Sequence, residues 1–196
     1  MPDRQSKPKA VIWDLDGTLS NDHARAHFVE VEQGRKRDWK SYFDAIDEDA
    51  PIAASMEILR ALRLAGIRTI FLTGRPEYTR PKTEQWLKAN GLTDYDRLLM
   101  RPDGEFRAAG EFKVEEVDRL CEEYEVVCAF EDRIDVAEHL RQSGIAVFLF
   151  GAGAEAAAEA LELADIAQDE LDALSALKAA EESGIADRDE EGVPGE

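Results

Sequence analysis

The sequence predicts an α/β fold, a Rossmann-like doubly wound parallel sheet of about five strands. Five short apolar runs, rich in β-branched and aromatic residues, recur at 10–13, 69–72, 97–100, 126–130 and 145–150. Each run is apolar throughout, as expected of a strand that helices cover on both faces. Stretches with helical spacing separate the runs, and this alternation indicates right-handed βαβ units in one parallel sheet.

Each of the expected helices lies between two of these strands. Three of the helical stretches end at a glycine or Asn-Gly pair, which commonly stops a helix: Gly66, Asn90-Gly91 and Gly144. The apolar sides of the helices are marked by Met56, Leu59, Leu62 and Leu64, by Trp86 and Leu87, by Val114, Val117, Leu120 and Tyr124, and by Ile134, Ala137 and Leu140.

Two segments fall outside this alternation. Residues 20–51 hold enough large apolar side chains for a small helical lid inserted after the first strand. We expect residues 1–152 to form one domain that includes this insert. Residues 153–182 are rich in Ala, Glu and Leu and predict an acidic helical segment, and 183–196 is predicted to be disordered because it is acidic and nearly free of large apolar residues.

The formal net charge is -19 at pH 7, and residues 151–196 carry much of it, with fourteen acidic and two basic side chains. Such a surface repels nucleic-acid backbones at long range. No apolar stretch approaches the roughly 18 residues of a membrane span, and the first nine residues lack a signal-peptide core. We expect a soluble cytoplasmic protein that does not bind membranes and has no evident protein partner. Cys121 and Cys128 are expected to be buried reduced thiols.

Two carboxylates, Asp14 and Asp16, follow the first strand at positions i and i+2. Burying charge there is costly without a partner, and a hard cation such as magnesium is a natural partner for carboxylates. Gly17 allows the backbone to turn tightly directly afterwards. Asp and Gly after a strand often form only a turn, but a turn alone does not explain the whole segment 14–19. The segment therefore indicates a metal-dependent site.

Polar clusters also follow two other strands. They are Thr73-Gly74-Arg75 and Glu131-Asp132-Arg133. In open parallel sheets, ligands bind beyond the carboxyl ends of the strands. Lys113, at the start of an expected helix, supplies a mobile positive charge suited to a phosphate group. Three polar clusters at three strand ends predict one site that binds a phosphorylated substrate.

Together these residues resemble the haloacid dehalogenase-like (HAD) superfamily of phosphatases, whose four sequence signatures appear in order between residues 8 and 150. The signatures are Asp14-Leu15-Asp16-Gly17-Thr18, then Thr73, then Lys113, and finally the acidic pair Glu131-Asp132. The resemblance implies the HAD fold and a phosphatase that depends on Mg²⁺.

The resemblance also implies a role for each residue. Asp14 would attack the phosphorus and form an aspartyl-phosphate. Asp16 would protonate the leaving alcohol and then deprotonate the attacking water. The Asp14 side chain, the Asp16 backbone carbonyl and Asp132 would hold Mg²⁺, supported by Glu131. The remaining two signature residues, Thr73 and Lys113, would bind the phosphoryl oxygens.

Within the superfamily, the chain is similar to 3′-phosphatase domains of the bacteriophage polynucleotide kinase type. Basic residues carry this similarity: Arg25 beyond the first signature, Arg75 after the second, Arg133 after the fourth, and the spacing of Arg101 and Arg107 before Lys113. The implied substrate-binding residues are Arg25, Gly74, Arg75 and Arg133. Two positions depart from the pattern, since Ala109 replaces an acidic residue and Glu131 replaces Asp. No Gly-x-x-x-x-Gly-Lys-Ser/Thr loop occurs, so no kinase half is expected within this sequence.

The insert leaves several alternatives open. Trp39, Tyr42 and Phe43 either stack on a base or, as we expect, fill the core of the lid. His23 and His27 have the spacing of a metal pair, but no other zinc ligand surrounds them, so we expect a polar lid face. For Arg25, a substrate contact and a surface ion pair are equally open.

The leading expectation is a phosphomonoesterase that acts on a polynucleotide 3′-phosphate end or a nucleotide. The net charge argues against long nucleic acid, although a terminal phosphate needs only a local basic patch. The alternative is a phosphatase for a small phosphorylated metabolite or a 5′-nucleotide. A non-catalytic binding module is the least expected reading, because the signature residues are intact.

Overall fold

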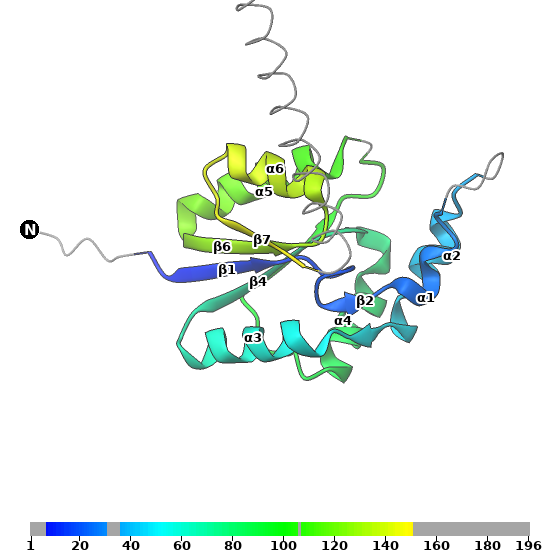
Figure 1. Ribbon diagram of the computed structural model, residues 1–196, viewed down its shortest axis with the longest axis horizontal. Coiled ribbons are helices and arrows are strands. Elements are labelled where there is room, and N and C mark those ends of the chain that lie inside the picture. Colours follow the sequence, from blue (N-terminus) through cyan, green and yellow to red (C-terminus); the bar gives the residue numbers. More distant parts are fainter. Residues whose placement is uncertain (1–6, 31–35, 106, 151–196) are drawn as a thin grey trace, which may run out of the picture. The chain divides into compact units, whose positions relative to one another are not determined.

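The computed structural model describes residues 7–30, 36–105 and 107–150. Five strands form one parallel sheet in the order β5-β4-β1-β6-β7 (Figure 1). They are β1 (Lys9–Trp13), β4 (Arg68–Pro76), β5 (Arg97–Arg101), β6 (Glu125–Glu131) and β7 (Val147–Leu149). The fold class and the five strands predicted from the apolar runs are confirmed.

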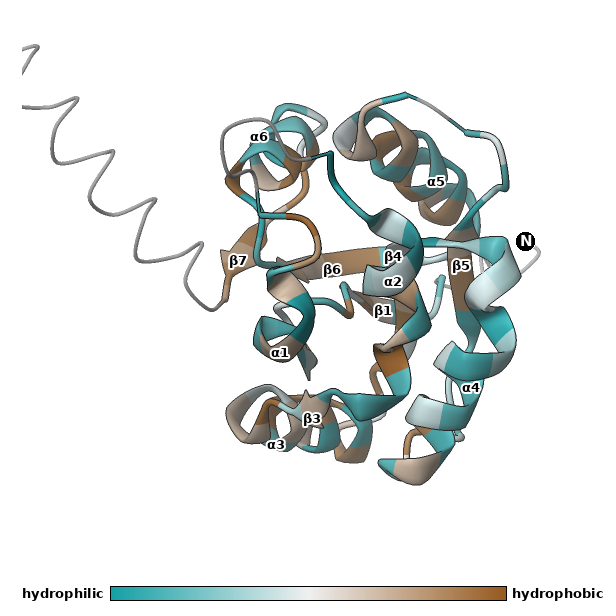
Figure 2. Ribbon diagram, turned by 90° about the vertical axis from the view of Figure 1, so that its right-hand side faces the viewer, coloured by the Kyte–Doolittle hydropathy of each residue, from teal (hydrophilic) through white to brown (hydrophobic). Residues whose placement is uncertain are grey.

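In the described residues, four longer helices cover the sheet, two on each face (Figures 1 and 2). They are α3 (Ala53–Leu64), α4 (Arg80–Ala89), α5 (Ala109–Glu123) and α6 (Ile134–Gln142). The apolar sides of α3 and α4 share one core cluster with Trp13 and Phe71. Those of α5 and α6 share the other with Ile12 and Ile70. Because successive side chains of a strand point to opposite faces, β1, β4, β5 and β6 each supply both clusters.

The central strand β1 marks the point where the strand order reverses. Trp13 in β1 is paired with Phe71 of β4 on one side and with Phe130 of β6 on the other. The chain builds β4 and β5 outward on one side of β1 and then crosses to place β6 on the other. In such sheets the crevice beyond the carboxyl end of the central strand is where ligands bind.

The insert between β1 and α3 contains the expected short helices and one feature that was not predicted. Its elements are β2 (Ser20–Asn21), α1 (His23–Ala26), α2 (Trp39–Asp44), the 3₁₀ helix η1 (Ile46–Glu48) and β3 (Ala50–Pro51). The strands β2 and β3 pair in antiparallel fashion and bring the two ends of the insert together. Two-residue strands carry no periodic signal, so the sequence did not reveal them. A second 3₁₀ helix, η2 (Glu77–Thr79), joins β4 to α4.

Other expectations fare differently. Cys128 is buried, but Cys121 is only half-buried at the margin of the α5 core contact, so the expectation of two buried thiols is wrong for Cys121. Both cysteines are free. No helix of the described ranges is long and apolar enough to cross a membrane. The predicted acidic helix at 153–182 and the tail at 183–196 lie outside the described residues, and the domain limits stay predictions.

Candidate active site

β1 leads to a buried carboxylate at the ligand-binding edge of the sheet. The backbone N–H of Asp14 donates to the Phe130 carbonyl at 3.0 Å, so pairing with β6 continues one residue beyond β1. The chain then turns, because the Leu15 carbonyl accepts the N–H groups of Leu19 at 2.9 Å and Ser20 at 2.8 Å. Asp14 is therefore fixed on a rigid backbone, with 5% of its surface exposed.

Side chains from α5 and β6 meet Asp14 at this edge. The Lys113 Nζ donates to Asp14 Oδ1 at 2.7 Å and to Glu131 Oε2 at 2.6 Å. Carboxylate oxygens of Asp14, Glu131 and Asp132 lie within 4.8 Å of one another. The structure thus brings together four residues that the sequence distributes over three separate motifs. The other oxygen of Asp14, Oδ2, accepts no hydrogen bond from the described residues.

The electrostatics of this acidic cluster favour a cation. Burial raises the pKa of Asp14 from 3.8 to about 7, with Lys113 opposing the rise and Glu131 adding to it. Burial, together with the charges of Asp14 and Glu131, raises the pKa of Asp132 to about 9. Lys113 alone therefore leaves part of the negative charge uncompensated. Three hard oxygen donors with excess charge fit a divalent cation such as Mg²⁺.

Asp16 lies in a different environment, between two arginines. Its Oδ1 atom accepts from Arg25 Nη2 at 2.5 Å and from Arg75 Nε at 2.9 Å and Nη2 at 2.5 Å. Burial alone would raise the pKa of Asp16, but Arg75 and Arg25 hold it well below its usual range. Asp16 is therefore a carboxylate in this structure. To act as an acid it must be protonated when substrate is bound.

Arg25 and Arg75, which the sequence predicts to bind substrate, do not line the cavity in the described structure. Both side chains are buried, and their donors are directed at Asp16 and at Asp49. The alternative of a surface ion pair for Arg25 is wrong, because its side chain is 2% exposed, whereas a direct role in substrate binding stays a prediction. The buried carboxylate of Asp49 attracts both guanidinium groups inward. We assign the two arginines to holding Asp16.

Asp49 itself was missed by the sequence analysis. Its Oδ1 and Oδ2 atoms accept from Arg25 Nε at 2.8 Å and Nη2 at 2.7 Å. It lies at the end of the acidic run Asp47-Glu48-Asp49, which reads as a solvated surface in the sequence. Asp49 is buried because it directly precedes β3, where the chain returns to the body of the domain. No local sequence pattern predicts the burial of Asp49.

The other predicted residues divide between the cavity and the layer behind it. Gly74 and Arg133 line the cavity above Asp14. Thr73 is fully buried, its Oγ1 accepts the Arg75 N–H at 3.2 Å, and it does not line the cavity in the described structure. Arg133 is exposed and pairs with Asp135 at 2.6 Å. Arg101, from the end of β5, also lines the cavity, and its buried Nε has no hydrogen-bond partner among the described residues.

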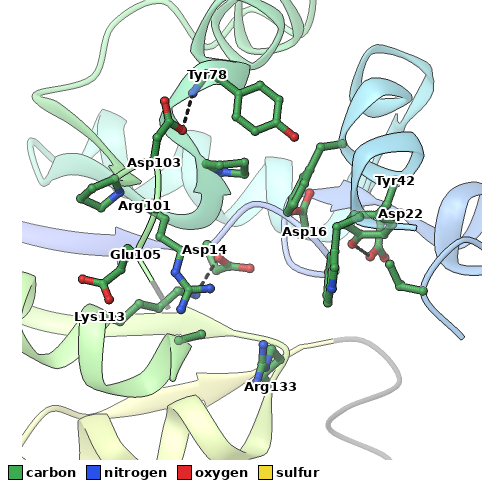
Figure 3. A pocket seen from close by; sticks show the side chains of 18 of the residues that line it. Asp14, Asp16, Asp22, Tyr42, Tyr78, Arg101, Asp103, Glu105, Lys113 and Arg133 are labelled. Atoms are coloured by element: carbon green, nitrogen blue, oxygen red, sulfur yellow. Dashed lines mark hydrogen bonds and ion pairs between the residues drawn. The ribbon is translucent and has the colours of Figure 1, made fainter. Parts of the chain in front are cut away.

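The cavity has a volume of about 540 Å³ and opens directly above the acidic cluster. Asp14, Asp16, Lys113 and Asp132 form its inner end. Figure 3 shows Lys113, Arg101 and Arg133 gathered on one side of Asp14, with Tyr78 and Tyr42 on other sides. A pocket of this volume accommodates a ligand of about the size of a nucleotide.

The three lid aromatics contact one another, as expected of a lid core, and stacking on a base stays a prediction. Trp39 stacks on Phe43 with ring centroids 5.8 Å apart and meets Tyr42 edge-on at 5.7 Å, so the three form a small cluster of their own. The same three side chains also line the cavity. His23 and His27 are both exposed on the lid.

Comparison with known proteins places this geometry in a family. Residues 8–154 match the family model described as the phosphatase domain of polynucleotide kinase PNKP. This range includes every residue of the acidic cluster and the whole lid. No curated protein sequence matches the chain.

Solved structures give a consistent picture. A structure titled as a Pnkp1/Rnl/Hen1 complex has 30% identity and a TM-score of 0.59 over 76% of this chain and 48% of its own. Another, titled as the Pnkp1/Rnl/Hen1 RNA repair complex, has 29% identity and a TM-score of 0.61 over 78% and 46%. The chain thus spans about half the length of these relatives. The class C acid phosphatase from Bacillus anthracis, at 17% identity and a TM-score of 0.58 over 76% and 68%, shares the fold.

Proposed function

Because this chain is a phosphatase that belongs to the family of polynucleotide kinase PNKP phosphatase domains, we propose that it is a Mg²⁺-dependent phosphomonoesterase. It works through an aspartyl-phosphate on Asp14. Its substrate is nucleic-acid-related, either a polynucleotide 3′-phosphate end or a nucleotide.

The observation that carries this proposal is the setting of Asp14. One oxygen, Oδ1, is fixed by Lys113 at 2.7 Å. The other is not hydrogen-bonded within the described residues, and Asp14 lines a cavity that Arg101 and Arg133 also line. A carboxylate presented in this way is a positioned nucleophile. Lys113, shared with Glu131 at 2.6 Å, supplies a fixed positive charge for a phosphoryl group that arrives there.

The residues that would hold the metal are Asp14, Asp132 and the backbone carbonyl of Asp16, supported by Glu131. When bound, Mg²⁺ supplies charge neutralisation for the phosphoryl oxygens. Asp16 enters the cycle protonated. In the first step Asp14 Oδ2 bonds to phosphorus, the ester P–O bond breaks, and the leaving alkoxide takes this proton, which leaves Asp16 as a carboxylate. In the second step water attacks the aspartyl-phosphate, the Asp14 O–P bond breaks, and Asp16 accepts the proton of the water.

The fixed geometry of Asp16 suits a residue that carries a proton in both directions. All four of its hydrogen bonds from the described residues, those of Arg25, Arg75 and Ser20, end on Oδ1. Asp16 also lines the cavity, so Oδ2 is left for the substrate and for water. The arginines favour the ionised form, which is the form required in the second step.

Three observations support a nucleic-acid-related substrate. The matching family is named for polynucleotide kinase, and two similar structures are titled as complexes with Rnl and Hen1, one as an RNA repair complex. The cavity is large enough for a nucleotide. Arg101 and Arg133 lie at its rim, where they reach a phosphate or sugar without approaching Asp16.

A substrate panel tests the proposal. Phosphate release would be measured from a 3′-phosphorylated oligonucleotide, 3′- and 5′-mononucleotides and a set of phosphorylated metabolites, with EDTA and with Mg²⁺ restored. We expect EDTA to abolish turnover, Mg²⁺ to restore it, and the 3′-phosphorylated nucleic-acid compounds to have the highest kcat/KM. Higher kcat/KM for a sugar phosphate than for every nucleotide would reject the substrate assignment in favour of a metabolite phosphatase.

A further inference from the structure

One side of the active-site cavity is aromatic. It is formed by Trp39, Tyr42 and Phe43 of α2 together with Tyr78 of η2, and all four line the same cavity as Asp14. We call these four residues the aromatic wall.

The aromatic wall is more exposed than a lid core requires. Trp39 is 47% exposed and Tyr78 54%, although both are large apolar side chains. Tyr42, by contrast, is 7% exposed and forms the inner part of the cluster. Leaving aromatic surface in contact with water loses the stabilisation that burial would give. An exposed apolar surface next to a reaction centre marks a place where a ligand is bound.

The wall is also positioned relative to the reaction centre. The Tyr42 hydroxyl donates to Asp22 Oδ2 at 2.5 Å, and the Arg25 guanidinium lies 4.1 Å from the centre of the Tyr42 ring. Arg25 is the residue that also holds Asp16 at 2.5 Å. The buried Arg25 side chain thus contacts both the Tyr42 ring, which packs against Trp39, and the Asp16 carboxylate. A ligand group bound on the wall has a defined position relative to Asp16.

The helix that carries the wall is fixed at both ends. Asp38 caps α2, since the Ser41 N–H donates to its Oδ1 at 3.0 Å. At the other end the Lys82 Nζ of α4 donates to the Asp44 carbonyl and, at 3.2 Å, to Asp47 Oδ1. A platform held in this way loses little conformational entropy when a ligand stacks on it.

The charges around the cavity limit what the wall can bind. Six carboxylates line the cavity, at Asp14, Asp16, Asp22, Asp103, Glu105 and Asp132, against the three basic side chains of Arg101, Lys113 and Arg133. In Figure 3, Tyr42 and Tyr78 lie on other sides of Asp14 than Arg101, Lys113 and Arg133, and the Arg37 guanidinium lies 5.9 Å from the centre of the Trp39 ring. A phosphate near Tyr42 would meet Asp22, whereas a neutral aromatic group would not be repelled. A nucleobase has this chemistry.

We propose that the aromatic wall is a nucleobase-binding subsite, with Trp39 as its main stacking platform, for the nucleotide whose phosphate lies at Asp14. The inference rests on the proposed nucleotide or polynucleotide substrate and adds a specificity element to it. In this proposal the protein recognises two groups of the substrate, the phosphate at Asp14 and the base on the aromatic wall, and needs no contact with a longer strand.

Two matched substrates test the subsite. One is a deoxyadenosine 3′-phosphate, and the other is the same sugar phosphate without its base; each is measured as a mononucleotide and at the end of a short oligonucleotide. Stacking of one base predicts that the wild-type kcat/KM is about 10- to 100-fold higher for the substrate with the base. Trp39→Ala should remove most of that ratio, and Trp39→Phe should restore it. Leu64→Ala, at a residue 90% exposed in α3 and outside the cavity, should leave the ratio unchanged.

Each other outcome is decisive. Equal kcat/KM for the two substrates in the wild type would overturn the subsite while leaving the proposed function intact. Equal losses on both substrates in Trp39→Ala, with the ratio kept, would show that Trp39 only supports the lid. If no 3′-phosphorylated compound is hydrolysed while other phosphate esters are, the proposed function itself fails, and the subsite with it.

Discussion

Gly17 lies so close to Asp132 that a β-carbon at position 17 would meet the Asp132 Oδ2 atom at 2.3 Å. Gly17 also has a φ of 74°, a conformation that other residues adopt only with strain. The turn after β1 and the acidic pair after β6 are therefore fitted to each other. Gly17, which the sequence predicts only to form a turn, therefore also contacts a proposed metal ligand.

Gly17→Ala should consequently lose activity beyond the cost of its backbone strain. The added methyl group must displace Asp132, so we expect kcat/KM to fall at least about 100-fold, the effect of a misplaced catalytic group, and the Mg²⁺ concentration needed for half activity to rise. Phosphate release as a function of Mg²⁺ concentration measures both.

Gly66→Ala is the matched control. Gly66 has a similar φ of 79°, but an added β-carbon would meet nothing within 4 Å. It should lose about 1 kcal/mol of stability and keep its activity. Equal kinetic losses in the two variants would show that the contact with Asp132 is unimportant.

Asp14→Asn should lower kcat by about 1,000-fold or more. The amide keeps the shape of the side chain but lacks the nucleophilic carboxylate oxygen. Acid-quenched wild-type protein should retain label from a substrate carrying labelled phosphate, and this variant should retain none. Asp16→Asn is the informative comparison. It should still form the labelled intermediate, more slowly, and then hydrolyse it poorly. Label retained on Asp14→Asn would contradict the covalent route.

The fold and the acidic cluster were predictable because their signals are local. Each strand is a short apolar run, and Asp14 and Asp132 follow such runs at the edge where parallel strands end, so parallel pairing brings them together. Lys113 lies near the start of α5, the helix that follows β5. The arginine positions were not predictable in the same way, since the direction of Arg25 depends on Asp49, a residue 24 positions away across the insert.

The stability of the metal-free protein should fall as the pH rises. The pKa of Asp14 is raised to about 7 and that of Asp132 to about 9, both from 3.8 in the unfolded chain. Between pH 3.8 and 9 the folded state therefore binds more protons than the unfolded state, and unfolding becomes easier as these protons leave. The lowered pKa of Asp16 makes stability rise with pH, but only at acidic pH, below this window.

Thermal denaturation at pH 6, 7.5 and 9, with EDTA or with Mg²⁺, measures the effect. We expect the Tm in EDTA to decrease across this range, and Mg²⁺ to raise it most at pH 9, where both carboxylates are ionised. Asp132→Asn should weaken the pH dependence and the Mg²⁺ effect together. A metal-free Tm that is the same at pH 6 and pH 9 would show that the acidic cluster carries no excess charge.

Asp49→Asn should reduce both stability and turnover, although Asp49 does not line the cavity. The variant removes the buried counter-charge of Arg25 and Arg75, and breaking a buried ion pair costs about 3–5 kcal/mol. Asp16 then becomes the main carboxylate partner of two guanidinium groups. Its pKa should fall further, which weakens proton transfer, so kcat should decrease more than KM increases.

Glu57→Gln is the control for loss of an ion pair as such. Its partner Arg60 is at 2.5 Å, but the two side chains are 73% and 52% exposed on α3, and exposed pairs contribute little. Denaturant unfolding and the kcat and KM of both variants, measured over a range of pH, separate the two cases. A change in KM alone for Asp49→Asn would mean that Arg25 and Arg75 serve substrate binding directly. A fall in kcat, with a shifted pH profile, is the result expected if they position Asp16 for proton transfer.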